Sequence, residues 1–329
     1  MGFELIHADE DFREIKTVEF FEQFDSSIGD YKNDNDWMLE LEADEWLKNP
    51  INPGDHVYIE NTEWGGPAER VRHSSDDAKV RVYGTNWRGL LKRRGVCPGK
   101  DQTHYTIEPC EANKLMAQFL GGWRRSLFSV SDENSGIICS GSIRYKPFDE
   151  TMAAMMGENA VLHLVFSHGQ VNLSVRRTGD LSKVIELSDE YDASVISQKR
   201  RGEYNHIVAL GRGEMADRDI VEMWMLDDGT VTENALLDIP DEHELSTYIY
   251  SYSAVETIGE LRAAAKKKLL EFSPAGTMEI TLSGDDTSLE LMDRVAVRDC
   301  VTGLESILRV EEKRLHIDSG GKRITHILK

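Results

Sequence analysis

The sequence contains few cysteines. Only four of its 329 residues are cysteines, and no two of them form a C-x-x-C pair. So few cysteines in a chain of this length do not make a disulfide framework, and their spacing does not fit a zinc site. We therefore expect reduced thiols at Cys97, Cys110, Cys139 and Cys300, in a protein made in the cytoplasm.

Long apolar segments are also lacking. No apolar run approaches the ~18 residues that a membrane-spanning helix requires. The N-terminal segment Met1–Leu5 has neither the basic nor the apolar region of a signal peptide. We accordingly expect no signal peptide and no membrane binding by the chain itself.

Positive charge is in short supply. The chain has 38 Lys and Arg against 59 Asp and Glu, which gives a formal net charge of −21. Such an excess of acid argues against a general DNA-binding or membrane-surface role, because phosphate groups would be repelled. About half of the excess lies in residues 1–50, where 15 acidic and 4 basic residues leave −11. A solvated acidic face is the simplest interpretation of this segment.

The apolar content is sufficient for packed cores. Hydrophobic residues make up 40% of the chain, and the length suggests about two or three domains. In the first hundred residues, Trp37, Leu39 and Leu41 alternate with polar residues, and short strands are predicted at His56–Glu60 and Lys79–Tyr83. Short strands at such close spacing predict a β-barrel or a β-sandwich.

The pattern then becomes mixed. Helices are predicted at 111–120 and 149–156, and strands at 136–143 and 161–166. Ser167–Gln170 is predicted to be a hairpin turn, followed by a strand with Val171, Leu173 and Val175 facing inward. Strands are predicted again at 207–210 and 220–226, a helix at 254–272, and strands over the last fifty residues.

Two segments resemble each other at a fixed distance. Asp55–Ile59 matches Asp293–Val297 at an offset of 238, and Gly65 and Gly303 have the same offset. Each match is followed by further predicted strands. The identity is low, and any two strand pairs with Asp and Gly turns would share some of it. The first interpretation is therefore a chance match between two strand pairs. The alternative interpretation is a repeat, with two copies of one β-barrel separated by the α/β region.

Three stretches together carry a family resemblance. They are Gly54–Gly66 followed by Val82–Leu91, then Tyr204–Glu214 continuing through Arg218 to Trp224, and finally Asp293–Lys329. In this order they resemble tail proteins from siphophages and prophages of Gram-positive bacteria, which are similar to the phage baseplate or tail-hub proteins. The resemblance covers nearly the whole chain.

The resemblance implies an α+β, mainly β fold. It would have two tube-type β-barrel domains, with small α/β domains packed outside. The expected boundaries are 1–108 for the first barrel, 109–180 for an α/β domain, 181–226 plus 277–329 for the second barrel, and 227–276 for an inserted helical or α+β segment. Larger members of related families carry C-terminal host-binding or wall-degrading domains. This chain ends at Lys329 on a predicted strand, so we expect a bare hub.

The function implied by the resemblance is structural and not enzymatic. The chain would be a tail-hub subunit that adapts the six-fold tail tube to the three-fold tail tip, as a homotrimer of two-barrel chains. Expected partners are the tail tube or distal tail protein, the tape measure protein, and tail-tip or receptor-binding proteins; phage DNA would only pass through the channel. Assembly would occur in the host cytoplasm, and the final location would be the virion tail. A receptor-binding tail-tip component and a tail-associated cell-wall hydrolase are the alternatives.

Several residue patterns that could carry chemistry lack essential parts. His163 and His168 flank a hairpin with no nearby Cys or carboxylate cluster, so a metal site is not expected. Gly211–Glu214 lacks the Lys-Ser/Thr ending of a phosphate loop and is better explained as a strand connection. Asn205–His206 lies near no nucleophile motif, and paired acids in an acid-rich chain carry little information. We predict no catalytic, cofactor-binding or metal-binding residue, and no cofactor.

One basic stretch stands out from the acidic background. Lys79–Lys100 holds seven Lys and Arg residues and no acid, with Trp87 inside it. Basic residues around an aromatic ring can bind single-stranded nucleic acid. The interpretation we favour is that this stretch pairs with the acidic residues 1–50 of the same or a neighbouring subunit.

Overall fold

A computed structural model gives the fold as two compact units. Unit 1 comprises Met1–Val195, Glu279–Cys300 and Glu305–Lys329, and unit 2 comprises Ile196–Met278 and Val301–Leu304. The structure describes residues 4–74, 76–100, 102–188, 193–200, 203–214, 217–226, 229–234, 244–255, 257–272, 275–284 and 289–329.

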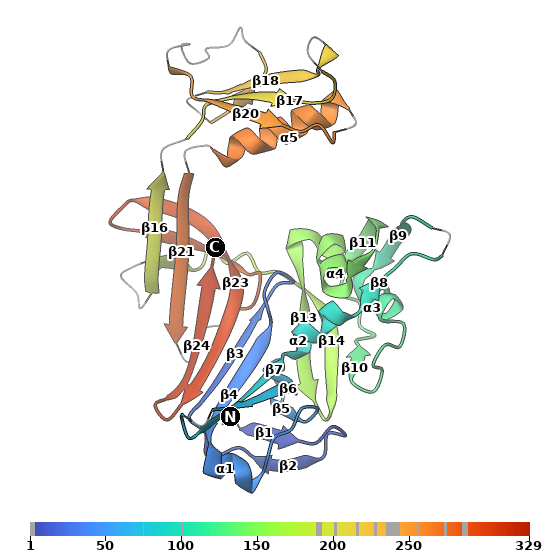
Figure 1. The fold of residues 1–329 in the computed structure, drawn as a ribbon, viewed down its shortest axis with the longest axis vertical. Helices are drawn as coiled ribbons and strands as arrows, with labels where there is room; N and C mark the ends of the chain where they lie inside the picture. The colour runs from blue at the N-terminus through green and yellow to red at the C-terminus, as the bar shows by residue number, and fades with distance from the viewer. Residues whose placement is uncertain are drawn as a thin grey trace. The chain divides into compact units, whose positions relative to one another are not determined.

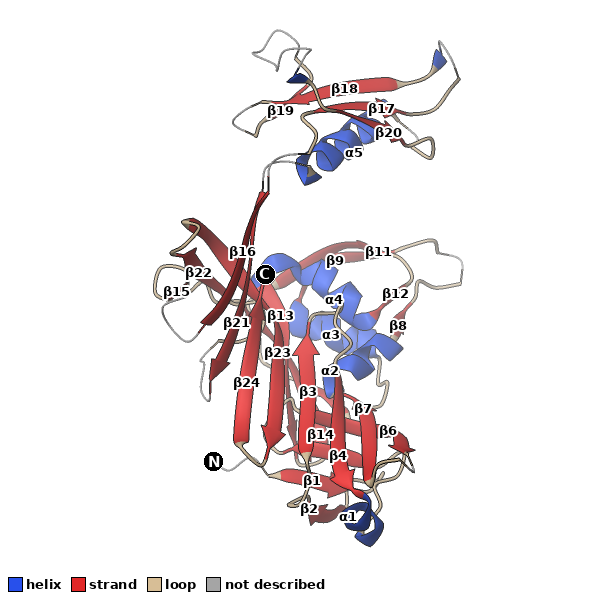
Figure 2. Cartoon of the chain, turned by 60° about the vertical axis from the view of Figure 1, so that its left-hand side comes forward, coloured by secondary structure: helices blue, strands red, loops and turns tan. Residues whose placement is uncertain are grey.

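A 13-stranded sheet forms the frame of unit 1 (Figures 1 and 2). Its main strand order is β16-β21-β24-β23-β3-β4-β7-β6-β5-β1-β2, and β22 pairs with both β15 and β23. The strands are β1 (Leu5–Ala8), β2 (Glu14–Thr17), β3 (Gln23–Gly29), β4 (Asp36–Glu42), β5 (His56–Ile59), β6 (Gly65–His73), β7 (Lys79–Thr85), β15 (Glu186–Ser188), β16 (Ala193–Arg200), β21 (Ala275–Gly284), β22 (Arg294–Asp299), β23 (Leu304–Asp318) and β24 (Gly321–Leu328). Helix α1 (Ala43–Lys48) follows β4.

The sheet contains the same strand order twice. One half runs β3-β4-β7-β6-β5, and the other runs β16-β21-β24-β23-β22. Numbered along the chain within each half, both are ordered 1-2-5-4-3. We call these two sets the first and second repeat. The repeat expected from the sequence is therefore present as strand topology.

The turn that precedes β5 recurs before β22. Gly54 and Met292 both have positive φ, 105° and 68°, and their N–H groups donate to the carbonyls of Ala68 and Val310. The following residues, Asp55 and Asp293, each accept a hydrogen bond at Oδ2 from the backbone N–H three residues earlier, at 2.8 and 3.1 Å. The matched aspartates thus have one structural role in both repeats.

The match between Gly65 and Gly303 does not correspond to a shared structural role. The turn residues pair with Ala68 and Val310, which are 242 positions apart rather than 238. Gly65 lies in β6, where a Cβ would come within 2.4 Å of Tyr58 Cα, whereas a Cβ on Gly303 would meet nothing within 4 Å. The offset therefore changes after β22, and Gly65 and Gly303 are not equivalent.

Asn86 ties three strands of the first repeat together. Its side chain is fully buried, and its Nδ2 donates to the carbonyls of Ser27 (2.6 Å) and Asp36 (2.9 Å). Its Oδ1 accepts from Ser26 Oγ and from the N–H of Gly65. A buried amide whose donors and acceptor all have partners holds the surrounding strands in one specific arrangement. This explains why an asparagine stands between β7 and the helix that follows it.

The region after β7 forms a helical layer over a small sheet. The added helices are α2 (Trp87–Leu90), η1 (Leu91–Arg93), α3 (Ala112–Leu120), α4 (Phe148–Met156) and η2 (Gly157–Asn159). The added strands are β8 (Gly95–Val96), β9 (Tyr105–Glu111), β10 (Phe128–Val130), β11 (Ile138–Ile143), β12 (Lys146–Pro147), β13 (Ala160–Ser167) and β14 (Gln170–Arg177). β13 and β14 are antiparallel, and β10 is parallel to β14.

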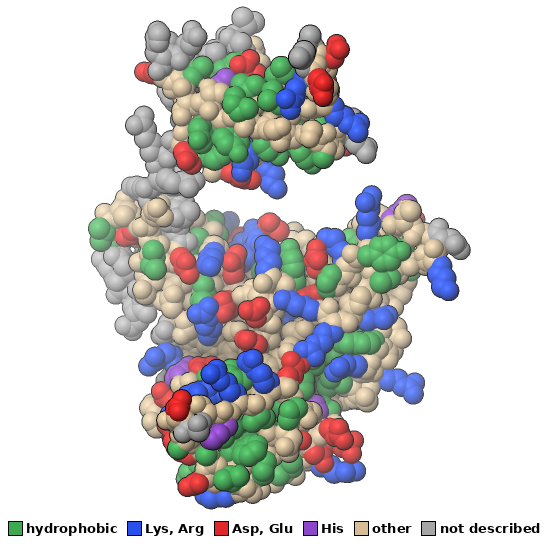
Figure 3. Space-filling model, in the orientation of Figure 1, with side chains coloured by type: hydrophobic (Ala, Val, Ile, Leu, Met, Phe, Trp, Pro, Cys, Tyr) green, Lys and Arg blue, Asp and Glu red, His purple; other side chains and the backbone are tan. Residues whose placement is uncertain are grey.

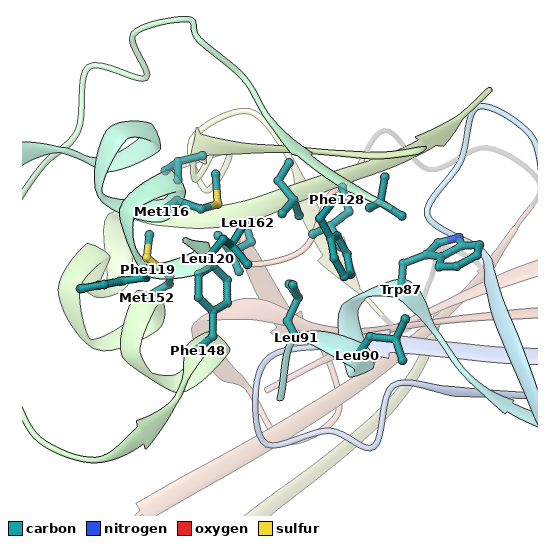
Figure 4. Close-up of a cluster of buried hydrophobic side chains, with 14 of the residues drawn as sticks. Trp87, Leu90, Leu91, Met116, Phe119, Leu120, Phe128, Phe148, Met152 and Leu162 are labelled. Carbon is teal, nitrogen blue, oxygen red and sulfur yellow. The ribbon is translucent and has the colours of Figure 1, made fainter. Parts of the chain in front are cut away.

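The core of this region is continuous with α2 (Figure 4). Trp87 is fully buried and stacks on Phe166 of β13, with ring centroids 4.7 Å apart. α3 begins where Glu111 accepts a hydrogen bond from the N–H of Lys114, and ends at Gly121 in the left-handed conformation. Burial alone would raise the pKa of Glu111, but hydrogen bonds from Ser135 and from backbone N–H groups offset it and lower the pKa to about 2.

Arg88 of α2 forms a buried ion pair with Glu63, in the β5–β6 connection, and a hydrogen bond with β13. Arg88 is 6% exposed, and its guanidinium forms a bidentate pair with Glu63, with Nη2–Oε2 at 3.0 Å. The same Nη2 donates to the carbonyl of Leu162 at 2.8 Å. Planar bidentate recognition of this kind requires arginine and not lysine.

Unit 2 is a one-sided α/β layer. Its sheet has the order β19-β18-β17-β20, from β17 (His206–Leu210), β18 (Ile220–Met225), β19 (Val231–Thr232) and β20 (Thr247–Ser251). Helix α5 (Ile258–Glu271) packs on it with Leu261, Ala265 and Leu269.

The structure places residues 203–226 differently from the boundaries given above. We assigned 181–226 to the second barrel domain, but β17 and β18 pair with β20 and pack against α5. The physical reason is that alternate residues of both strands, among them Ile207, Ala209 and Val221, are covered by this helix. In chain order, β17 to α5 of unit 2 are an insertion between β16 and β21, the first two strands of the second repeat.

Most other predicted elements are confirmed. Trp37, Leu39 and Leu41 are buried together on β4, and Val171, Leu173 and Val175 are buried on β14. The helices predicted at 111–120 and 149–156 begin one residue away, at Ala112 and Phe148. The third begins at Ile258 and not at 254, because Thr257 caps it by accepting from the N–H of Glu260. Within the described residues no helix has the length and apolarity needed to cross a membrane.

We predict that Arg88→Met lowers the free energy of unfolding by about 3–5 kcal/mol, because it leaves the Glu63 carboxylate buried without a partner. Arg93→Ala is the matched control, since Arg93 pairs with Glu69 at an exposed position and should cost about 0.2–1 kcal/mol. Urea unfolding measures both. Equal losses for the two variants would contradict the role given to Arg88.

Candidate assembly surfaces

The two repeats are joined by a seam of backbone pairing. Glu312–Asp318 of β23 lies antiparallel to Gln23–Gly29 of β3, with seven residues of each strand in register. A strand of the second repeat thus completes the edge of the first. We refer to this β3–β23 contact as the seam.

A histidine side chain crosses the seam. His316 lies directly opposite Asp25, and its Nδ1 is 2.6 Å from Asp25 Oδ1. Its Nε2 is 3.1 Å from Asp318 Oδ2. The hydrogen bond with Asp25, supported by Asp318, raises the pKa of His316 above its usual value. The imidazolium therefore bridges the two repeats when it is protonated.

One segment of β6 presents an open edge. β5 pairs with β6 only at Gly65–Pro67, and β7 pairs with it from Ala68 to His73. Among the described residues, no strand lies on the other side of Glu69–His73, four of whose five side chains are exposed. Arg70 lies over the ring of Tyr83, 4.3 Å from its centroid. Of the strands in the main order, β16 and β2 are the end strands.

The basic stretch Lys79–Lys100 is largely paired within the chain. Glu40, 7% exposed, binds Lys79 at 2.8 Å and Arg81 at 2.6 Å. Burial opposes ionisation of Glu40, but these two cations lower its pKa below its usual value. Lys92 donates to the carbonyl of Asn33, and Arg94 to that of Phe119. Trp87 is buried, so it offers no surface for a nucleic-acid base. The pairing with residues 1–50 predicted from the sequence is confirmed at Glu22 and Glu40.

Part of the N-terminal acid surrounds an open groove of about 490 Å³. Its lining includes Glu19, Glu42 and Asp44, none of which has an ion-pair partner among the described residues. Phe20, in the same lining, is 69% exposed. On the face of unit 1 drawn in Figure 3, acidic and basic side chains are interspersed over most of the surface.

The two histidines weighed as metal ligands lie apart from any ligand cluster. His163 and His168 both contact neighbouring serines, at 3.5 Å from Ser174 and 2.7 Å from Ser167. In the part of the chain that the structure describes, no three His, Cys, Asp or Glu residues are grouped to hold a metal ion.

The Gly211–Glu214 segment lies in the connection from β17 to β18. Across this connection the N–H of Gly211 donates to the carbonyl of Asp219, and the N–H of Asp219 donates to the carbonyl of Arg212. Gly213 has a φ of 92°. Among the described residues of this connection no α-helix begins, so they show no phosphate site of the helix N-terminal type.

His206 has two partners that the sequence did not indicate. Its Nδ1 is 2.8 Å from Thr247 Oγ1, and its Nε2 is 3.0 Å from Glu222 Oε1. The ring is 5% exposed and stacks on Trp224 at 5.3 Å. Cross-strand register explains the cluster, because His206 lies opposite both Trp224 and Thr247. Both ring nitrogens are engaged, which suits a structural histidine.

Comparison with known proteins finds similarity in structure only. No protein-family model and no curated protein matches the sequence. Among solved structures, the 43 kDa tail protein of prophage MuSo2 from Shewanella oneidensis matches with a TM-score of 0.60 at 10% identity, over 99% of this chain and 98% of that one. A tail protein from Neisseria meningitidis MC58 matches with 0.53 at 13% identity, over 100% and 97%. A chain of the phage P2 baseplate in its activated conformation matches with 0.50 at 11% identity, over 99% and 98%.

These matches extend over the full length of each chain. The chain therefore has the fold of phage and prophage tail and baseplate proteins, and it is mainly β. The coarse part of the fold expected from the sequence is confirmed.

The pH dependence of stability tests the His316 contact. The folded-state pKa is raised, so the stabilisation is fully present below the unfolded pKa, about 6.5, and is lost as pH rises through the higher folded value. We predict that the stability difference between the wild type and His316→Gln is largest at pH 6 and shrinks as the pH rises into the alkaline range. The exposed His163→Gln is the control. Denaturant titrations that show a difference independent of pH would contradict the bridge.

Proposed function

We propose that the chain is a structural hub subunit of a bacteriophage or prophage tail. The observation that carries the proposal is the repeated strand order, with its two copies joined edge to edge at the seam. The similarity in fold to tail and baseplate proteins supports it. The finer expectation of a Gram-positive host rests on the sequence motifs alone.

The seam suggests how one copy would contact the next. By strand order, β16 corresponds to β3, and β6 corresponds to β23. The contact that joins β23 to β3 within a chain would then recur between chains as β6 of one copy against β16 of another. The candidate strand segments are Glu69–His73, whose outer edge is open, and the end strand β16. Unpaired strand edges are templates for such pairing.

A head-to-tail contact of this kind closes into a ring when its rotation allows. Three chains with two repeats each would give six similar positions, which can meet a six-fold tail tube on one side and a three-fold tip on the other. In this proposal each repeat forms a tube-type β-barrel in the ring. The α/β region at 109–180 and unit 2 would then be available to other tail proteins.

The charge of the chain suits a channel that DNA traverses. An acidic wall repels phosphate and keeps DNA moving, whereas Lys and Arg contacts would hold it. The basic residues nearest to the acidic segment already pair with Glu22 and Glu40. We propose that part of the remaining acid of residues 1–50 faces the channel. Only charges within about 8–10 Å of the DNA would act at physiological salt.

The proposed partners are further copies of the chain, the tail tube or distal tail protein, the tape measure protein, and tail-tip or receptor-binding proteins. The proposed location is the virion tail, after assembly in the host cytoplasm. The neighbours in fold are tail and baseplate proteins, which supports a location in the tail.

We predict rings of three chains in concentrated protein, seen by negative-stain electron microscopy and counted by mass photometry. Ile196→Lys should abolish them, because Ile196 on β16 is 65% exposed and a lysine on a strand edge hinders pairing. Ile249→Lys is the control, since Ile249 is 58% exposed on β20, a strand of a different sheet. Closed rings with another number of chains, or a protein that stays monomeric at every concentration, would contradict the proposal.

We also predict no hydrolysis of bacterial cell walls by the purified chain, measured as release of soluble fragments. The residues to mutate in this test are Thr247, His206 and Glu222, because their hydroxyl, imidazole and carboxylate groups are in hydrogen-bond contact. Fragment release that is lost in Glu222→Gln would establish an enzyme and overturn the structural assignment.

A further inference from the structure

Two cysteines lie directly opposite each other in the α/β region of unit 1. In the antiparallel pair of β9 and β11, Cys110 is the register partner of Cys139. Opposed residues in antiparallel strands have Cα atoms about 4.5 or 5.5 Å apart, depending on their place in the ladder. Both values lie within the range of about 4.4–6.8 Å that a disulfide bond requires.

A bulge turns both thiols toward the same core. Ile107 pairs with Gly141 and Cys110 with Cys139, so β9 has one more residue than β11 between the two pairs. Ile107 and Cys110 are three residues apart and would otherwise face opposite sides of the strand. Instead Ile107 and Cys139 belong to the core around α3, and Cys110 packs against it. The extra residue is Glu108 or Pro109, both exposed.

The two thiols differ in access. Cys139 is fully buried, whereas Cys110 is partly exposed. A reagent can therefore reach Cys110 first, while Cys139 is reached only from within the protein. This is the arrangement of an accessible thiol that reacts first and a buried thiol that resolves the mixed disulfide.

We propose that Cys110 and Cys139 form a reversible cross-strand disulfide when the protein leaves a reducing environment. Each cysteine is present as a thiol in the structure, so the bond is an added modification and not part of the folded frame. The inference is independent of the tail-hub assignment and would hold for this chain in any role.

A small-molecule disulfide such as oxidised glutathione is sufficient as the oxidant. The Cys110 thiolate attacks one sulfur, forms a mixed disulfide and releases one glutathione thiolate. The Cys139 thiolate then attacks Cys110 Sγ, closes the protein disulfide and releases the second glutathione. Two protein thiols are oxidised, one glutathione disulfide is reduced to two thiols, and the two protons balance the two thiolates released.

The second step should depend on pH. Burial, with smaller effects from the Cys110 thiol and the Glu111 carboxylate, raises the pKa of Cys139. Little Cys139 is ionised at neutral pH, so closure should accelerate as pH rises above the usual thiol range.

The bond would enclose residues 110–139, which contain α3 and its cap Glu111. A closed loop of this size lowers the entropy of the unfolded chain. After oxidation, the disulfide would hold the β9–β11 pair and α3 together. Six residues of α3 are buried in the core.

The experiment treats the reduced, full-length protein with oxidised glutathione, blocks the remaining thiols with iodoacetamide, and maps peptides without reduction. We expect the Cys110 peptide linked to the Cys139 peptide, with faster linkage at pH 9 than at pH 7. The melting temperature should rise on the order of 5 °C on oxidation and return after reduction.

Matched variants separate this pair from the other thiols. Cys97→Ser with Cys300→Ser removes the two exposed cysteines and should leave linkage and thermal shift unchanged. Cys110→Ser should abolish both, and Cys139→Ala provides a second test in which glutathione remains attached at Cys110. Alkylation of Cys110 and Cys139 after full oxidation, a stable glutathione adduct at Cys110 in the wild type, or linkage through Cys97 or Cys300 would overturn the proposal.

Discussion

Backbone pairing between β3 and β23 is the interaction on which the arrangement of unit 1 depends. An unpaired strand edge exposes a row of N–H and C=O groups that must bind water or another strand. At the seam, seven residues of each repeat provide backbone hydrogen-bond partners for the edge strand of the other repeat. The contact makes one sheet from segments that are almost 300 positions apart in the chain. Applied a second time, between copies, the same pairing is the basis of the proposed ring.

The α/β region depends on a second constraint, the desolvation of Arg88. A buried guanidinium is tolerated only with its charge and its donors satisfied, and Glu63 and the Leu162 carbonyl do both. These partners come from the β5–β6 connection and from β13, so the ion pair fixes α2 between the frame and the helical layer. Together with the pairs that Lys79 and Arg81 form with Glu40, this contact gives several cations of Lys79–Lys100 a structural partner within the chain.

Sequence periodicity predicted the local elements well where one face is buried. The alternation at Trp37, Leu39 and Leu41 and the helix faces of α3 and α5 depend on neighbours a few residues away. The seam could not be predicted this way, since β23 and β3 are both amphipathic and nothing local specifies which distant edge each will join. The assignment of β17 and β18 to a barrel differs from the structure for the same reason. A half-buried strand has the same alternating pattern whether a helix covers it or it forms part of a barrel.

Some structural features are visible in the sequence as matching residues and not as periodicity. The Asp55 and Asp293 match was a real signal, since both aspartates close the same turn, but Met292 in the place of Gly54 concealed half of it. His206, His316 and Cys110 each have a partner set by cross-strand register, which local patterns in a single sequence do not reveal. Candidate binding or switching residues in a sheet protein therefore emerge only once strand pairing is known.

Hydrogen exchange at Glu69–His73 tests the central claim most directly. We predict that the backbone amides of this segment that do not bond to β7, and those of β16 that do not bond to β21, become protected when concentrated wild-type protein assembles, to a degree similar to the amides of the seam. The monomeric Ile196→Lys variant should leave the outward-facing amides of Glu69–His73 unprotected. Assembly that protects other surfaces while both edges exchange as in the monomer would contradict the account.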